Sequence, residues 1–441
     1  MQNRTRAYVR LITPLILTLS LVTAPLVFAG HEDDPHSNNF HSMGHDVDPA
    51  SLFNPNVDQN IHTDIAFWGQ YAIQGNWNGF RILDISAPGN PKLISFTECQ
   101  GDQGDVSVWG NLVFRSTNSP NPGTRMCDGQ AVPAGFEGIH VFDISNVNDP
   151  VLLAAVPTNC GSHTHTLLPD LANNRVLLYV NSSQDFCVGG TVDGSLIDVI
   201  EVPLSNPASA SVIHQELLFG GALVCHDVAV FTAGVNRAVC ASHANANVFD
   251  ISNPADPVPL YTIAEPGVGV GGSWHSAALT WDGKVIILGW EPGGGVAPEC
   301  EATDPAVKKS LFFYDSATGA KLGQWTLPRP QSSVENCTLH NYNIVPVRSG
   351  RYVLVHGSYQ SGSSVVDFTA PANAVEVGFT DPPPIVPTDL GGAWSTYWYN
   401  NFMYESNITE GLNIFRLSDR VTAGAMRLPY LNPQTQDFTI P

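Results

Sequence analysis

Short runs of apolar and β-branched residues alternate along most of the chain with turns rich in Gly, Pro, Asn and Asp. The clearest unit spans residues 224–252, where polar turns separate three runs of strand length, and a fourth run follows the turn at Pro254. Runs of this length between turn residues are typical of β-strands. Four antiparallel strands in about 50 residues form one blade of a β-propeller.

The third strand of this unit recurs along the sequence. Its copies cover residues 80–86, 139–145, 197–202, 248–252, 311–315, 364–368 and 412–417. A single blade leaves its apolar faces uncovered, and closure of a ring buries each face against a neighbour. The seven copies therefore predict an all-β fold, a seven-bladed β-propeller of four-stranded antiparallel blades. We expect it to occupy residues 61–441, with residues 426–441 as the last outer strand.

The N-terminus has the pattern of a targeting segment. Arg4, Arg6 and Arg10 precede an apolar run, and small residues before Gly30 form a cleavage site. This pattern predicts a signal peptide over residues 1–29, and hence a secreted or periplasmic protein. The sequence has no second apolar stretch long enough to span a membrane, so the mature chain is expected to have no membrane span.

Residues 30–60 follow as a polar segment rich in His and Asp, without a strand pattern. Polar tracts of this kind rarely pack, so we expect a flexible leader. The alternative is a segment that collects metal ions through its four histidines, His31, His36, His41 and His45.

Composition narrows the classes of partner. The net charge is −21 and charged residues make up only 13% of the chain. An acidic surface argues against binding to nucleic acid. We expect a monomer whose ligand is a small molecule or an extracellular macromolecule.

Eight cysteines suit an oxidising compartment. Their places in the repeat put them in loops on one face of the propeller or on adjacent strands. We therefore expect four local disulfides: Cys99–Cys127, Cys160–Cys187, Cys225–Cys240 and Cys300–Cys337.

Five of the seven predicted blades have a histidine where the innermost strand begins. Innermost strands line the central channel, so these side chains should meet at one mouth of it. They are His62, His163 or His165, His226, His275 and His340, with Asp105 as a sixth member of the ring. The choice between His163 and His165 stays open, because a shift of one residue reverses the direction of a side chain.

A second ring follows from the topology, because the loop after each second strand lies beside the start of the first. His243, His356, Glu291 and Glu405 occupy such loops. Histidines supported by carboxylates and further imidazoles are typical of a metal site. The alternative is that each histidine is a structural hydrogen-bonding group within its own blade.

The third strands resemble the LVIVD repeat, found in secreted and surface-bound bacterial β-propellers. Residues 82–86 and 141–145 carry this resemblance. It implies the fold and export, and no particular reaction. In layout only, the histidine ring is similar to the channel-mouth histidines of nitrous oxide reductase and of selenium-binding protein propellers, which hold copper. Blades two and seven lack the histidine.

These observations favour a secreted propeller with a histidine-rich site for copper, zinc or iron at one mouth of its channel. Should it be an enzyme, metal-dependent oxidation or hydrolysis of a small substrate is expected, with Glu291 and Glu405 as general bases. The alternative is a non-catalytic extracellular propeller that binds a protein or glycan through Trp77, Tyr359 and Trp398.

Overall fold

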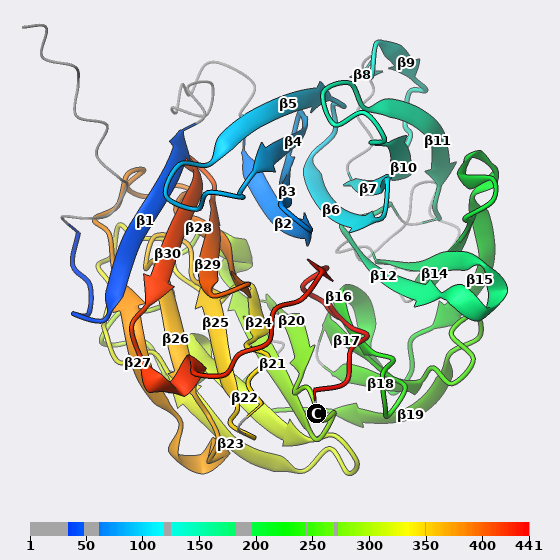
Figure 1. Cartoon of the computed structure of the whole chain (residues 1–441). Coiled ribbons are helices and arrows are strands. Elements are labelled where there is room, and N and C mark those ends of the chain that lie inside the picture. Colours follow the sequence, from blue (N-terminus) through cyan, green and yellow to red (C-terminus); the bar gives the residue numbers. More distant parts are fainter. Residues whose placement is uncertain are drawn as a thin grey trace, which may run out of the picture.

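The computed structural model describes residues 34–47, 61–118, 125–159, 161–181, 196–243, 245–268, 272–348 and 350–440. Within these ranges the chain forms seven antiparallel sheets arranged as blades around a central channel (Figure 1), which confirms the predicted fold class. The predicted signal peptide, His31 and the predicted pair Cys160–Cys187 lie outside these ranges.

Each blade has four strands that run outward from the channel in chain order, except in blade seven. Blade one contains β2 (His62–Trp68), β3 (Tyr71–Asn76), β4 (Gly79–Asp84) and β5 (Lys92–Glu98). Blade two contains β6 (Gln103–Trp109), β7 (Leu112–Thr117), β10 (Gly138–Asp143) and β11 (Val151–Pro157). Blade three contains β12 (Thr164–Asp170), β13 (Arg175–Asn181), β14 (Leu196–Pro203) and β15 (Ser211–Leu217). Blade four contains β16 (Leu223–Phe231), β17 (Arg237–His243), β18 (Ala246–Asp250) and β19 (Val258–Ile263).

The remaining blades follow the same plan. Blade five contains β20 (Gly272–Leu279), β21 (Val285–Pro292), β22 (Ser310–Asp315) and β23 (Lys321–Thr326). Blade six contains β24 (Tyr342–Ile344), β25 (Val353–Gly357), β26 (Ser363–Asp367) and β27 (Val375–Thr380). Blade seven contains β28 (Ala393–Tyr399), β29 (Phe402–Asn407), β30 (Gly411–Leu417) and β1 (Phe40–Val47). A small hairpin, β8 (Arg125–Cys127) and β9 (Gln130–Val132), extends from blade two.

The described ranges contain no α-helix. Their helical turns are all of the 3₁₀ type: η1 (Leu171–Asn173), η2 (Pro207–Ser209), η3 (Gly293–Gly295), η4 (Ala306–Lys309), η5 (Pro371–Asn373) and η6 (Arg420–Thr422). No helix among them is long and apolar enough to cross a membrane.

The ring closes differently from the prediction. The outer strand of blade seven is β1, which pairs antiparallel with β30 from Phe40 opposite Leu417 to Val47 opposite Gly411. The leader was predicted to be flexible, and for this part of it the prediction is wrong. An outer strand needs few buried side chains, here mainly Phe40 against Phe415, so its sequence shows no apolar alternation.

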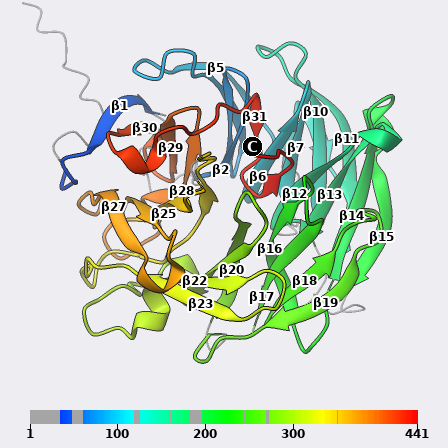
Figure 2. The same ribbon diagram turned by 60° about the horizontal axis from the view of Figure 1, so that its bottom comes forward.

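The C-terminal segment, predicted to be that outer strand, instead crosses the middle of the ring (Figures 1 and 2). β31 (Tyr430–Leu431) pairs with the end of β2, and β32 (Thr435–Gln436) pairs parallel with the end of β16. Tyr430 stacks on Trp68 at 4.7 Å between ring centroids. The segment therefore covers the mouth where the innermost strands end, opposite the mouth where they begin.

The core consists of apolar side chains packed between neighbouring blades, as where Phe67 of blade one stacks on Tyr399 of blade seven at 4.7 Å. Three predicted disulfides are confirmed: Cys99–Cys127, Cys225–Cys240 and Cys300–Cys337. They are compatible with an extracellular or periplasmic protein.

Candidate metal centre

Four of the predicted channel histidines come together where the innermost strands begin. Their ring centroids form a chain of short steps: 4.3 Å from His163 to His226, 4.0 Å from His226 to His275 and 4.2 Å from His275 to His340. The four side chains are buried, and they come from blades three to six.

β-Bulges direct two of these histidines into the channel. In β16 the pairing with β17 skips His226, and in β20 the pairing with β21 skips His275. A bulged residue leaves the regular alternation of the strand and can turn toward a site. In blade seven the same kind of bulge skips Trp394. The Trp394 side chain lines a cavity next to the four histidines, which is described below.

Glu291, on β21, is the carboxylate of this cluster. Its Oε2 lies 3.7 Å from Nε2 of His275, and its Oε1 lies 3.7 Å from Nε2 of His340. The hydroxyl of Tyr359 donates a hydrogen bond of 2.8 Å to Oε1. Burial raises the pKa of Glu291 to about 7, against the lowering effect of the Tyr359 hydrogen bond. Donor atoms of His226, His275 and Glu291 all lie within 4.8 Å of one another.

The protonation states of the four histidines suit metal binding, because a histidine must be neutral to coordinate a metal ion. Burial lowers the pKa of His226 to about 4 and that of His340 to about 3. Burial and the neighbouring imidazoles hold the pKa of His163 and of His275 well below the ordinary value. Nδ1 of His226 and Nδ1 of His275 are buried without a hydrogen-bond partner among the described residues.

Nδ1 of His340 faces the backbone carbonyl of Trp394. A carbonyl oxygen only accepts, so Nδ1 carries the hydrogen and Nε2 keeps its lone pair. That lone pair is on the nitrogen that lies near Glu291.

The structure does not bring the other predicted histidines into this cluster. His62 is buried beside Asn76, because the bulge of β2 falls at the two residues after it. His165 has a serine hydroxyl at each ring nitrogen, Ser107 at 2.7 Å and Ser116 at 2.8 Å.

The two predicted loop histidines also lie elsewhere. Nδ1 of His356 is hydrogen-bonded to the hydroxyl of Ser358 at 2.8 Å, and its ring packs against Trp325. His243 ends β17 opposite Leu223 and does not line the cavity above the cluster.

Glu405 is likewise placed apart from the cluster. It pairs with Thr396, after the bulge of β28 at Trp394, whereas Glu291 pairs with Ser273, before the bulge of β20 at His275. Glu405 accepts hydrogen bonds from Ser363 at 2.6 Å and from Asn407 and Asn413 at 3.0 Å each. These partners occupy its oxygens inside blades six and seven.

A cavity of about 430 Å³ opens above the cluster. The four histidines and Glu291 line part of it, and Trp77, Tyr359, Leu390 and Trp394 supply its apolar walls. Tyr359 and Trp398, predicted as exposed contacts for a macromolecule, are both buried. Tyr359 faces this cavity instead, where its ring lies 4.4 Å from that of His340.

Comparisons with known proteins agree with the fold. Residues 62–97 match the family model of the LVIVD repeat. The chain is a β-propeller with an LVIVD repeat. The WD40 β-propeller domain of Doa1 covers 88% of this chain and 99% of its own, at 11% identity and a TM-score of 0.50. A functionally unknown protein from Desulfotomaculum acetoxidans covers 73% and 90%, at 9% identity and a TM-score of 0.46. No curated protein matches the chain in sequence.

The channel of this LVIVD-repeat propeller also contains a cluster of three buried aspartates, of which only Asp105 was predicted to lie there. Asp64, Asp105 and Asp227 line a small enclosed space next to the histidines, together with Gln434 of the C-terminal segment. Burial raises the pKa of Asp64 to about 7, with a further contribution from Asp105. Burial, Asp105 and Asp64 raise the pKa of Asp227 well above the ordinary value. The spacing held a signal, since Asp227 follows His226 directly and Asp64 lies two residues after His62.

Asp105 was predicted as a member of the histidine ring. It lines this channel space, and its Oδ2 accepts the backbone N–H of His165 at 2.8 Å. It is therefore a partner of His165 and of the acidic group.

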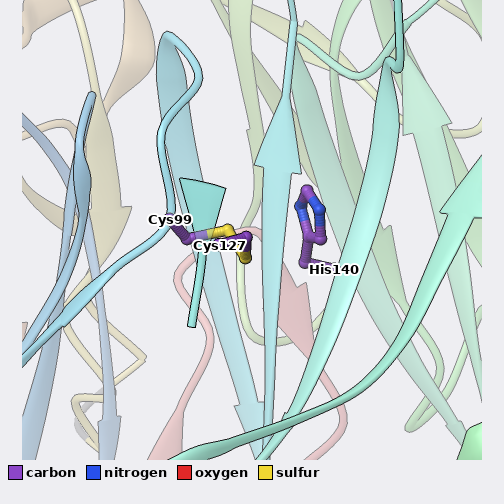
Figure 3. Close-up of side chains that lie close together, drawn as sticks. All are labelled: Cys99, Cys127 and His140. Carbon is purple, nitrogen blue, oxygen red and sulfur yellow. A yellow bond between two sulfur atoms is a disulfide. The ribbon is translucent and has the colours of Figure 1, made fainter. Parts of the chain in front are cut away.

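Two further groupings of potential ligands lie outside the channel of the LVIVD-repeat propeller. Cys99, Cys127 and His140 lie close together (Figure 3), but both sulfur atoms are joined in a disulfide and are not free thiolates. A more exposed group consists of His214 and Glu216 on outer strand β15 and Asp256 in the turn before β19. Neither group adjoins the cavity.

Proposed function

We propose that the histidine cluster holds one transition metal ion, with His226, His275 and Glu291 as ligands. The observation that carries this proposal is that donor atoms of all three lie within 4.8 Å of one another. Metal–ligand bonds near 2 Å separate two ligands of one ion by at most about 4 Å. A contraction of about 1 Å would therefore complete the set.

His340 is the fourth ligand in this proposal. Its hydrogen bond to the Trp394 carbonyl leaves Nε2 free to coordinate, and Nε2 already lies 3.7 Å from Glu291. A carbonyl behind a metal-bound histidine fixes the ring and raises its basicity. Imidazole and carboxylate donors together suit zinc, copper or iron.

The cavity gives this site the form of a catalytic centre. Structural zinc sites are closed by protein ligands, whereas catalytic ones keep a position open for water or substrate. A bound ion here would adjoin the 430 Å³ cavity. It would supply Lewis-acid or redox chemistry. We infer a metal-dependent oxidation or hydrolysis of a small molecule.

A proton count distinguishes two roles of Glu291, that of metal ligand and that of general base. With a pKa of about 7, it could act as a general base near neutral pH, and as a ligand it must lose its proton when the metal binds. Calorimetric titration in two buffers with different ionisation enthalpies counts that proton. Release of a proton that disappears in Glu291→Gln supports the ligand role.

The proposal is tested by titrating chelator-stripped protein with Zn²⁺, Cu²⁺ and Fe²⁺. We expect one tight site, weakened at least 100-fold by His275→Ala. His356→Ala is the matched control, because that histidine is as deeply buried but contacts Ser358 and Trp325. Equal metal affinity in the wild type and both variants would overturn the proposal.

A further inference from the structure

The walls of the cavity indicate what binds above the metal. We propose that this cavity binds a small uncharged aromatic alcohol, a phenol, with its ring against Trp394 and Trp77 and its hydroxyl toward the histidines. The exclusion of cationic ligands rests on the proposed function, because it requires the metal ion, whereas the exclusion of anions from the metal-free cavity and the aromatic site do not.

The shape and surface of the cavity favour a single ring. Its volume of about 430 Å³ lies toward the lower end of the range of about 300–1,000 Å³ typical of ligand pockets. Trp77, Leu390 and Trp394 pack against one apolar cluster, which Ile61, Tyr359 and Ile408 form. Aromatic walls of this kind favour a flat apolar ring, because stacked or edge-on ring contacts add about 0.5–1.5 kcal/mol to burial.

In the metal-free protein, the residues that line the site disfavour anions. No Lys or Arg lines the cavity among the described residues. Glu291 lies in it, and Asp64, Asp105 and Asp227 line the adjoining channel space. In the metal-free protein, an aromatic carboxylate would thus be buried among carboxyl groups without a cationic side chain to receive it. A cationic amine would instead be repelled by the proposed metal ion.

The polar floor requires a group that can both donate and accept. Glu291 accepts a hydrogen bond from Tyr359, and Nε2 of His275 and Nε2 of His340 each lie 3.7 Å from one of its oxygens. A hydroxyl can donate to a carboxylate oxygen of Glu291 and present its own oxygen to a metal, which a plain hydrocarbon cannot do. The cavity therefore joins an apolar upper part to a polar lower part.

The test measures phenol, benzoate and benzylamine binding by calorimetry, with metal-free and metal-loaded protein. We expect phenol to bind at least tenfold more tightly than benzoate in the metal-free form, and more tightly than benzylamine in the metal-loaded form. Trp394→Leu should weaken phenol binding at least tenfold. Trp77→Leu, on another blade, is a second variant in case the first does not fold.

Trp109→Leu is the matched control, because Trp109 packs on Trp68 and Tyr430 at the opposite mouth. Equal binding of benzoate and phenol to the metal-free protein, or phenol binding unaffected by both cavity variants, would overturn the inference. Phenol binding without any metal uptake would refute the proposed function but support the aromatic site. Metal uptake without phenol binding would refute only the aromatic site.

Discussion

The hydroxyl of Tyr359 in blade six donates a hydrogen bond of 2.8 Å to Oε1 of Glu291 in blade five. This contact holds the carboxylate between His275 and His340, at 3.7 Å from a nitrogen of each. It also lowers the pKa of Glu291, which burial raises. A residue outside the proposed ligand set thus controls both the position and the charge of one ligand.

Removal of this hydroxyl is the first test. Tyr359→Phe should raise the pKa of Glu291 above 7 and weaken metal binding at pH 6–7 by about tenfold, the typical effect of a hydrogen bond to a charged group. The loss should shrink at pH 9, where Glu291 is ionised in both proteins. Tyr352→Phe, which removes a hydroxyl bound to Asp282, should leave metal affinity unchanged at every pH.

Glycine at position 295 makes room for the same contact. A Cβ at Gly295 would lie 2.5 Å from Oη of Tyr359 and 2.8 Å from Oε1 of Glu291. Gly295→Ala should therefore separate the two side chains and weaken metal binding about as much as Tyr359→Phe. Gly294→Ala is a close control, because Gly294 also has positive φ but no atom near its Cβ position. Equal metal affinity in the two alanine variants would contradict this account.

The acidic group in the channel should make stability depend on pH. The pKa of Asp64 rises from 3.8 to about 7 on folding, so the unfolded chain releases this proton at lower pH than the folded one. Stability should therefore fall as pH rises from about 4 to about 7. Asp64→Asn removes this loss and should raise the melting temperature at pH 8 by a few degrees, with little gain at pH 4. A larger gain at pH 4, or no gain beyond that of the exposed Asp149→Asn, would refute the assignment.

Closure of the ring by β1 includes a charged contact that can be tested. Asp46 on β1 pairs with Arg81 of blade one, whose side chain is only 1% exposed. Asp46→Ala leaves that charge buried and should cost about 2–3 kcal/mol of unfolding free energy, less than for a fully buried pair because Asp46 is partly exposed. Denaturant unfolding measures the change. Asp256→Ala, which removes a largely exposed carboxylate, should cost under about 0.5 kcal/mol.

The blade number could be predicted because third strands are buried on both faces and repeat a recognisable pattern. Strand β1 could not be predicted, because an outer strand buries few side chains and its sequence has the pattern of a polar segment. The covering of the far mouth by the C-terminal segment depends on backbone pairing and on stacking of Tyr430 on Trp68, which no repeat reveals.

The site shows the same division. Topology placed Glu291 beside His275, because the end of a second strand adjoins the start of the first. The positions of β-bulges determine which of these strand histidines face the channel. Bulges turn His226 and His275 inward, whereas the bulge of β2 leaves His62 within its blade. Glu405, predicted in the same kind of loop as Glu291, instead pairs with Thr396 within β29 and accepts hydrogen bonds from Asn407 and Asn413. Side-chain partners of this kind are fixed by packing and have no signal in spacing.

Anomalous X-ray diffraction from crystals of the metal-loaded protein, recorded on both sides of the zinc or copper edge, tests the central claim most directly. We expect one strong peak per chain, within about 2.5 Å of donor atoms of His226, His275 and Glu291. Its absence at saturating metal, or a main peak at His214, Glu216 and Asp256, would contradict a metal centre in the channel.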